Sequence, residues 1–466
     1  MSAAIRSMLR FKLTFQRLAV NEFQRSYARG PPLHPEGNDF SSDRVPTRLK
    51  RRLAKQGLSV EDYVGDSAMR GSIQDVPAKD SATVLPPESA SSGFPRNSEE
   101  LQTLIKDMKE TAPMSSPAVE RSEHFPSDTE KYQDWRRTQS RKAFRPRVDP
   151  SATSIVLFPG QGSQFVGMGQ DTLGYGQASD LFEEASAVLG YDLLKMCLSG
   201  PLSSLSKTVH CQPAILVSSL AAIEKLKEQN PEAIETCVGT AGFSVGEFAA
   251  LVFAEVMSFA DAVEVVRIRA EAMQKASEEV PSGMMTTFLN HSSKLKTAML
   301  AAREYCKQRC NIDDPVCQVA NYLYPECKVI AGHTEALDFV EQHAKTFGIR
   351  RTKRLPVSGA FHTRLMSPAQ KPVKKALEKV TLHFPEIPVY SNVTGARFRH
   401  PSKVAELLTA QIVAPVKWEQ TLHVVYSRPQ GEAFPSTFEA GPGNQLGTLL
   451  KLVNIRAHEK YTHVDV

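Results

Sequence analysis

The chain has 466 residues, of which 41% are hydrophobic and 23% are charged, and roughly 100–200 residues per domain predicts two to four globular domains. Its seven cysteines are too few for a disulfide framework. Because their number is odd, at least one thiol is unpaired, which indicates a reducing compartment. The net charge of +5 is too small an excess to indicate nucleic-acid binding. The sequence also contains no run of about 18 apolar residues, which a membrane-spanning helix would need.

Residues 1–30 combine six basic side chains with a single acid, Glu22, and apolar residues lie between the charges. An amphipathic, arginine-rich and acid-poor N-terminus is typical of a mitochondrial transit peptide. A secretory signal would need an uninterrupted apolar stretch, which Arg10, Lys12 and Arg17 break. The sequence therefore predicts import into the mitochondrial matrix, with an ordinary basic tail as the alternative.

Residues 31–150 hold 13 of the chain's 30 prolines and 15 serines, which together make up 28 of these 120 residues. A segment of this composition buries too little apolar surface to offset the entropy lost on folding. We therefore expect a largely disordered leader or linker here.

Regular patterns begin after residue 150, and strands then alternate with helices: strands at 154–158 and 235–243, and helices at 178–189, 213–228 and 245–256. This alternation predicts an α/β fold with a parallel sheet that is covered on both faces. The turn at Gly160-Gln161-Gly162 lacks the third glycine of a dinucleotide-binding fingerprint, so nucleotide binding is not supported.

The strongest chemical signal is the segment Gly242-Phe243-Ser244-Val245-Gly246, which lies where the second strand meets the next helix. A serine on such a tight turn presents its hydroxyl, and small residues must flank it because backbone segments pack closely there. The first amide groups of the helix point at the serine oxygen. We predict that Ser244 is a nucleophile, with a helix-capping serine in a glycine-rich turn as the alternative.

A nucleophilic serine needs a base, and His362 is the favoured one of the chain's 12 histidines. It follows a segment of small residues with a glycine turn at Gly359 and precedes a helical pattern at 364–380. A histidine in such a loop could reach Ser244 in space. His210 is the rival, although its place at the start of a helix favours a packing role.

A third candidate is Arg269, within the helical pattern at 259–280. It lies three residues after Val266 and four before Met273, and therefore on the apolar face of this helix. An arginine that faces a core keeps its charge and needs an acceptor. Either a buried acidic side chain or a substrate carboxylate would serve, and the structural ion pair is the more common case.

Six motifs in a fixed order give the region from about residue 151 to the C-terminus a resemblance to the malonyl-CoA:acyl-carrier-protein transacylase family, most of all to its mitochondrial animal members. The motifs are Phe158-Pro159-Gly160-Gln161-Gly162-Ser163-Gln164, the turn around Ser244, the helix with Arg269 and Met273-Gln274, Gly359-Ala360-Phe361-His362, Pro415-Val416-Lys417-Trp418 and Glu439-Ala440-Gly441-Pro442-Gly443.

The resemblance implies an α/β-hydrolase-like large subdomain with a parallel sheet, formed by residues 151–282 and 356–466, and an inserted ferredoxin-like small subdomain at 283–355. By position, Ser244 matches the nucleophile and His362 the general base and acid. The other matches are Arg269 for the grip on the malonyl carboxylate, Gln161 and Val245 for the backbone N–H groups of the oxyanion hole, Gln411 for a main-chain carbonyl that orients the histidine, and Asn321 for an asparagine near that histidine.

The resemblance also implies the reaction: malonyl passes from malonyl-CoA to the phosphopantetheine thiol of a mitochondrial acyl carrier protein, in fatty acid synthesis. Ping-pong kinetics through a malonyl-Ser244 ester are expected, with no metal or bound cofactor. Phe361 matches a position that differs with substrate in related acyltransferase domains of polyketide synthases. Domains that transfer malonyl have phenylalanine there, and domains that transfer methylmalonyl have serine. The resemblance therefore implies that Phe361 excludes branched substrates, with a simple packing role as the alternative. Phe243 departs from the histidine usual in bacterial members, which should alter the pocket wall more than the chemistry.

Acyl carrier proteins present an acidic helix, and we expect it to dock on a basic run that ends eight residues before His362, namely Lys345, Arg350, Arg351, Lys353 and Arg354. A solvated basic strand is the alternative. Two other classes of protein stay open. A serine hydrolase would share the turn at Ser244 without needing Arg269, and a non-catalytic binding or RNA-associated mitochondrial protein would work through its leader.

Overall fold

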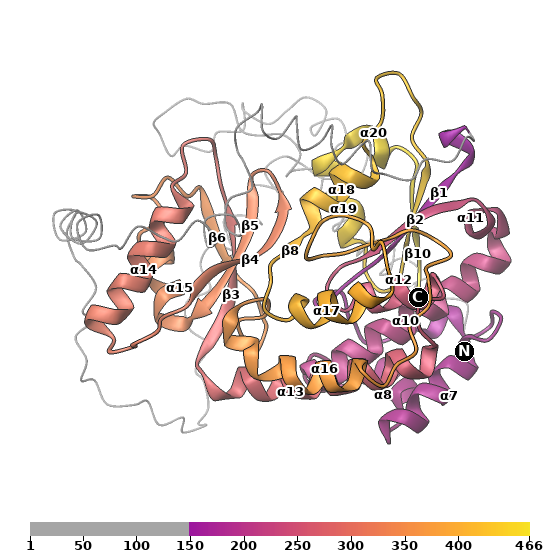
Figure 1. Ribbon diagram of the computed structural model, residues 1–466, viewed down its shortest axis with the longest axis horizontal. Helices are drawn as coiled ribbons and strands as arrows, with labels where there is room; N and C mark the ends of the chain where they lie inside the picture. The colour runs from indigo at the N-terminus through magenta and orange to yellow at the C-terminus, as the bar shows by residue number, and fades with distance from the viewer. Residues whose placement is uncertain (1–148) are drawn as a thin grey trace, which may run out of the picture. The chain divides into compact units, whose positions relative to one another are not determined.

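The computed structural model of the protein describes residues 149–466, so the predicted transit peptide and the leader as far as residue 148 lie outside the described residues. In the described part, two β-sheets with helices packed against them form an α/β fold, as predicted (Figure 1). No helix within residues 149–466 is long and apolar enough to cross a membrane.

The first sheet, sheet A, is parallel throughout and has the strand order β10-β9-β1-β2-β7. Its strands are β1 (Ser154–Phe158), β2 (Cys237–Gly242), β7 (Val389–Tyr390), β9 (Ser436–Ala440) and β10 (Tyr461–Val464). The central strand β1 is buried along its whole length, as expected for a parallel strand with an apolar run at 155–158. Its alternate side chains enter two cores, because Val156 and Phe158 pack on one face and Ile155 and Leu157 on the other.

Helices cover both faces of sheet A (Figure 1). The core that contains Val156 is closed by the helices α7 (Ala178–Leu189), α8 (Leu193–Ser199), α9 (Leu202–Leu205), α10 (Thr208–Gln229), α11 (Pro231–Glu235), α12 (Gly246–Phe253), α13 (Phe259–Glu279), α16 (Gln370–Leu377) and α17 (Ser402–Gln411). The core that contains Ile155 is closed by α18 (Trp418–Val425), α19 (Gln445–Val453) and α20 (Ile455–His458). Short 3-10 turns lie at η2 (Pro150–Ala152), η3 (Gln170–Thr172) and η4 (Arg364–Ala369).

The second sheet, sheet B, has the order β6-β3-β5-β4-β8. Its first part follows the chain order β3 (Ser282–Phe288), α14 (Leu295–Arg309), β4 (Cys317–Tyr324), β5 (Cys327–His333), α15 (Thr334–Gln342) and β6 (Arg351–Arg354). These four strands are antiparallel neighbours, which gives the predicted ferredoxin-like βαββαβ arrangement. The two helices bury a core of their own around Met285, Ile330 and Phe339.

The structure differs from the sequence predictions at several boundaries. The helix predicted at 364–380 is divided into η4 and α16, because Pro368 has no N–H to donate to a helical carbonyl. Helix α10 begins at Thr208 rather than 213, since the N–H of Thr208 donates to the Oε1 of Gln274, 3.1 Å away. Sheet B also gains an unpredicted parallel strand, β8 (Val416–Lys417), from the C-terminal half of the chain.

Candidate active site

Ser244 lies on a sharp turn between β2 and α12, at the carboxyl edge of sheet A. Its φ of 54° is in the left-handed region, which is strained for a residue with a Cβ. The turn requires glycine on both sides. A Cβ on Gly242 would lie 1.8 Å from the carbonyl oxygen of Gly246, and a Cβ on Gly246 would lie 2.4 Å from the carbonyl oxygen of Phe158.

Asn392, which follows β7, holds this turn from the neighbouring strand. Its Oδ1 accepts a hydrogen bond of 2.7 Å from the backbone N–H of Ser244, and its Nδ2 donates one of 2.7 Å to the carbonyl oxygen of Gly242. Since β7 pairs directly with β2, the sheet brings Asn392 to the turn although 148 residues separate it from Ser244. Hydrogen bonds from outside the local segment thus hold the strained backbone of Ser244 in place.

His362 meets Ser244 in the arrangement of a base and a nucleophile. The Nε2 of His362 lies 2.9 Å from the Oγ of Ser244, and its Nδ1 lies 2.8 Å from the main-chain oxygen of Gln411. Because a carbonyl oxygen only accepts, Nδ1 carries the proton and Nε2 is free to accept one from the serine. Burial, together with the charge of Arg269, lowers the pKa of His362 to about 4, so the imidazole is neutral at physiological pH.

Arg269 is fully buried on the core face of α13, and its guanidinium also reaches Ser244. The guanidinium donates to three neutral oxygens: Oε1 of Gln212 at 2.5 Å, Oε1 of Gln411 at 2.8 Å and Oγ of Ser244 at 3.1 Å. Its Nε has no hydrogen-bond partner among the described residues. Burial lowers the pKa of Arg269 to about 10, which leaves the group protonated at neutral pH.

The two sequence-predicted alternatives for Arg269 can now be compared. Within residues 149–466 no carboxylate forms an ion pair with it, whereas Arg267, two residues earlier, pairs with Glu264 and Glu271 at 2.7 and 2.9 Å. The charge of Glu247 acts on Arg269, but the carboxyl oxygens of Glu247 accept hydrogen bonds from Asn392 and Gln411 instead. The guanidinium therefore has a charge without a directly bound counter-ion.

The predicted oxyanion-hole residues flank the same serine. Val245 directly follows Ser244 and precedes the first turn of α12, so its N–H has no intrahelical acceptor. Gln161 lies on the loop after β1, and this loop packs tightly on the turn, because a Cβ on Gly160 would lie 2.4 Å from the carbonyl oxygen of Phe243. In the described part of the chain, neither backbone N–H donates to another residue.

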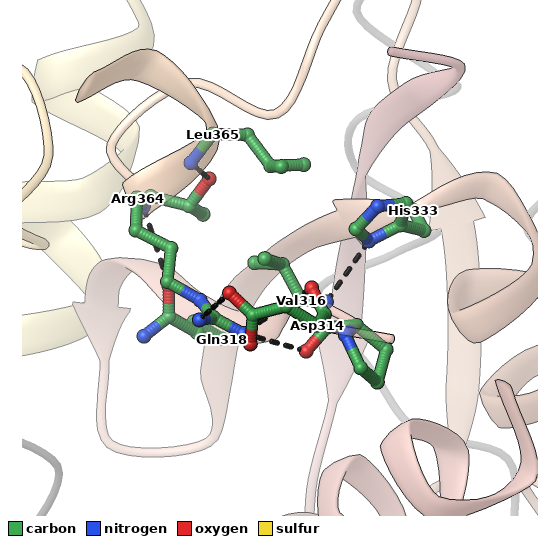
Figure 2. Close-up of polar contacts among 8 residues, drawn as sticks. Asp314, Val316, Gln318, His333, Arg364 and Leu365 are labelled. Atoms are coloured by element: carbon green, nitrogen blue, oxygen red, sulfur yellow. Dashed lines mark hydrogen bonds and ion pairs between the residues drawn. The ribbon is translucent and has the colours of Figure 1, made fainter. Parts of the chain in front are cut away.

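The two remaining predicted residues are buried. Phe361 directly precedes His362 and lies in the large core, and Asn321 lies on β4, with an Oδ1 that has no partner among the described residues. The loop that carries His362 continues to Arg364, which forms an ion pair with Asp314 of the ferredoxin-like part (Figure 2). This ion pair joins the histidine loop to the segment before β4.

That segment has a second attachment within the ferredoxin-like part. The Nδ1 of His333, at the end of β5, accepts a hydrogen bond of 2.9 Å from the N–H of Val316 (Figure 2). The contact fixes the backbone that presents Asp314 to Arg364, so sheet B is connected through hydrogen bonds to the loop of His362.

The predicted basic run is only partly available to a partner. Lys345, Arg350, Arg351 and Lys353 are exposed, but Arg354 forms ion pairs with Asp338 and Glu341 of α15. Arg354 of β6 lies directly opposite Met285 of β3, whose side chain is in the helix-covered core. Arg351 and Lys353 alternate with Arg354 along β6 and therefore lie on the opposite face of sheet B.

Sequence reasoning missed three buried polar residues of the site, which are Gln212, Glu247 and Asn392. Burial raises the pKa of Glu247 to about 8, against the opposing effect of the donors from Gln411 and Asn392 and of the charge of Arg269. A single carboxyl beside the apolar stretch at 248–253 was a usable signal for Glu247, but no local pattern marks the other two.

Comparison with known proteins shows the family of the chain. The acyl transferase domain model matches residues 155–434. The human protein named malonyl-CoA-acyl carrier protein transacylase, mitochondrial, is 56% identical over 317 residues, which are 68% of this chain and 81% of the human protein.

Solved structures with a similar fold come from the same family. The malonyl CoA-acyl carrier protein transacylase of Coxiella burnetii matches with a TM-score of 0.61 at 29% identity, over 68% of this chain and 95% of that one. A malonyl-transacylase solved in complex with its type II polyketide synthase acyl-carrier protein matches with a TM-score of 0.58 at 31% identity, over 67% and 96% of the two chains. The chain belongs to the malonyl-CoA-acyl carrier protein transacylase family of acyl transferases.

Proposed function

We propose that this malonyltransferase works by a ping-pong mechanism through an ester on Ser244, and that its acceptor is the acyl carrier protein of mitochondrial fatty acid synthesis. One observation carries the mechanism. The Oγ of Ser244 lies within hydrogen-bond distance of both the free imidazole nitrogen of His362, at 2.9 Å, and the guanidinium of Arg269, at 3.1 Å. A nucleophile, its base and a cation for the second carboxylate of malonate therefore meet at one atom.

In the first half-reaction, the Nε2 of His362 takes the proton of Ser244 while Oγ attacks the thioester carbonyl of malonyl-CoA. The resulting oxyanion would be stabilised by the free N–H groups of Gln161 and Val245, at about 2.7–4 kcal/mol for each donor. Collapse of the tetrahedral intermediate breaks the carbon–sulfur bond. The departing CoA thiolate then takes the proton from His362, and malonyl-Ser244 remains.

In the second half-reaction, His362 takes the proton of the phosphopantetheine thiol as its sulfur attacks the ester. Collapse of this second intermediate returns the proton from His362 to the Oγ of Ser244 and releases the malonylated carrier. The main-chain oxygen of Gln411 keeps the imidazole in the tautomer that both steps require. Because His362 handles every proton, the proposed mechanism contains no step that calls for a metal or a bound cofactor.

Substrate selection is assigned to the residues that surround Ser244. A malonyl carboxylate would give Arg269 the ionised partner that it lacks, and the planar guanidinium can bind it with two parallel hydrogen bonds. The buried ring of Phe361, next to His362, is proposed to limit space at the α-carbon, and Asn321 to contribute a polar group near the histidine. Acetyl-CoA has no carboxylate and would leave the buried guanidinium without this partner.

The mitochondrial setting rests on two supports. The human relative carries the word mitochondrial in its name, and residues 1–30 have the composition of a transit peptide. We propose the matrix as the compartment on the same grounds.

The carrier is proposed to dock on the basic surface formed by Lys345, Arg350, Arg351 and Lys353. Arg354 is left out of this surface because Asp338 and Glu341 already neutralise its charge. The surface includes the edge strand β6, whose Arg351 and Lys353 are exposed and lie on the face of sheet B opposite α14 and α15. Opposite charges on an acidic carrier would steer its approach more than they would increase its affinity.

The low pKa of His362 predicts the pH dependence of acylation. With a pKa of about 4, the imidazole stays able to accept a proton when the pH falls from 7 to 5.5. A histidine with the ordinary pKa of about 6.5 would lose roughly eightfold in its basic form over that range. We expect kcat/KM for malonyl-CoA to change by less than about twofold. An eightfold fall would place the pKa near its ordinary value.

Arg269→Ala should reduce the preference for malonyl-CoA over acetyl-CoA by about ten- to a hundredfold, which is the size expected for a hydrogen bond to a charged group. The matched control is Arg267→Ala, on the same helix but in surface ion pairs with Glu264 and Glu271. Ratios of kcat/KM for the two thioesters provide the measurement. An unchanged ratio in Arg269→Ala would show that the malonyl carboxylate is held elsewhere. If the wild-type protein released free malonate faster than it transferred malonyl to carrier protein, it would be a serine hydrolase.

Charge reversal at Arg350 and Lys353 should raise KM for carrier protein several-fold at low salt and leave acylation by malonyl-CoA nearly unchanged. Arg351 is avoided because its guanidinium stacks 4.1 Å from the ring centroid of Phe288. The difference between variant and wild type should shrink at high ionic strength, where screening weakens the wild-type encounter. Reversal of the exposed Lys307 and Arg309 on α14 is the control with the same change in charge.

Equal losses in both half-reactions of the Arg350→Glu/Lys353→Glu variant would contradict the docking proposal. That result would assign these residues to CoA binding or to the stability of the fold. An equal rise in KM for the control variant would show that net charge, and not this surface, controls the encounter.

A further inference from the structure

Glu247 is a buried carboxyl group that takes no part in the proposed proton transfers. It lies on α12, three residues after Ser244, and only 1% of its surface is exposed. Its Oε2 accepts a hydrogen bond from the Nε2 of Gln411, and its Oε1 accepts one of 3.2 Å from the backbone N–H of Asn392. Both oxygens therefore receive donors from elements that surround the nucleophile.

The amide of Gln411 can point in only one direction among these partners. Its Nε2 donates to Glu247 and, at 3.0 Å, to the main-chain oxygen of Ser244, which can only accept. Its Oε1 accepts from the Nη2 of Arg269 at 2.8 Å, and a guanidinium can only donate. If the amide were reversed, an N–H group would face the cation and a carbonyl oxygen would face two acceptors.

We propose that Glu247 is a positioning residue that locks the side-chain amide of Gln411 and, through it, sets the guanidinium of Arg269 for the malonyl carboxylate. This inference rests on the role proposed above for Arg269. It assigns two separate tasks to Gln411, because the main-chain oxygen orients His362 while the side-chain oxygen orients Arg269.

A carboxyl group suits this task and an amide does not. Whether ionised or protonated, both oxygens of Glu247 can accept a hydrogen bond, whereas the nitrogen of a glutamine at this position cannot. In Glu247→Gln one of two donors, from Gln411 or Asn392, would meet an N–H group. The backbone N–H of Asn392 can only donate and cannot turn, so the new carboxamide would keep its oxygen there and present its N–H group to Gln411. The amide of Gln411 would then turn its oxygen toward this donor and its N–H groups toward Arg269.

Glu439 provides a matched control for burial and chemistry. It is fully buried and accepts hydrogen bonds from the N–H groups of Leu446 and Gly447, at 3.1 and 2.8 Å, and from the hydroxyl of Tyr461, at 2.6 Å. These contacts fix the start of α19 and none of them reaches the site. Glu439→Gln should therefore cost stability in a similar way without changing the choice of substrate.

The experiment measures kcat/KM of the full chain for malonyl-CoA and acetyl-CoA. Glu247→Gln should lower the ratio of malonyl to acetyl by about tenfold, mainly through a higher KM for malonyl-CoA, while the value for acetyl-CoA changes little. The dependence of the acetyl reaction on pH should stay as in wild type, since His362 bonds to the main chain of Gln411. Glu439→Gln should keep the wild-type ratio.

A double-mutant cycle with Gln411→Ala tests whether Glu247 acts through that side chain. We expect Glu247→Gln to lower the ratio no further once the Gln411 side chain is removed. A further tenfold loss in the double variant, or an unchanged ratio in Glu247→Gln alone, would overturn the inference. Failure of the proposed function is distinguishable, because Arg269→Ala would then also keep the wild-type ratio.

Discussion

A buried positive charge next to a serine hydroxyl organises this site. The guanidinium of Arg269 is removed from water, and its hydrogen bonds go to neutral oxygens of Gln212, Gln411 and Ser244. A buried charge without an ionised partner is costly, so the surrounding chain has to supply acceptors at fixed positions. The same charge also acts with burial to keep His362 neutral and able to accept a proton.

The fold explains how residues far apart in the chain reach one oxygen atom. Parallel pairing of β7 with β2 brings Asn392 onto the turn of Ser244, and α17 ends at Gln411, whose two oxygens serve His362 and Arg269 separately. The ferredoxin-like part enters the chain between these elements without interrupting sheet A. Its ion pair between Asp314 and Arg364 instead connects it to the histidine loop.

Local patterns in the sequence predict much of the fold and part of the site. Helix α7 has the predicted bounds because its apolar spacing is regular, and the glycines around Ser244 follow from the close backbone contacts of the turn. Gln212 and Asn392 gave no such signal, because a buried polar side chain is defined by tertiary partners and not by spacing. Strand β8 has two residues, too few to show a period, and its pairing with β4 depends on the completed fold.

Intact-protein mass spectrometry after brief mixing with malonyl-CoA, in the absence of carrier protein, tests the central claim most directly. The account predicts that wild-type protein gains the mass of one malonyl group and that digestion locates it on Ser244. Ser244→Ala, which removes one hydroxyl from the turn, should gain no mass while it keeps the wild-type circular dichroism spectrum. A malonyl adduct on the alanine variant, or transfer by wild-type protein without any adduct, would contradict the covalent mechanism.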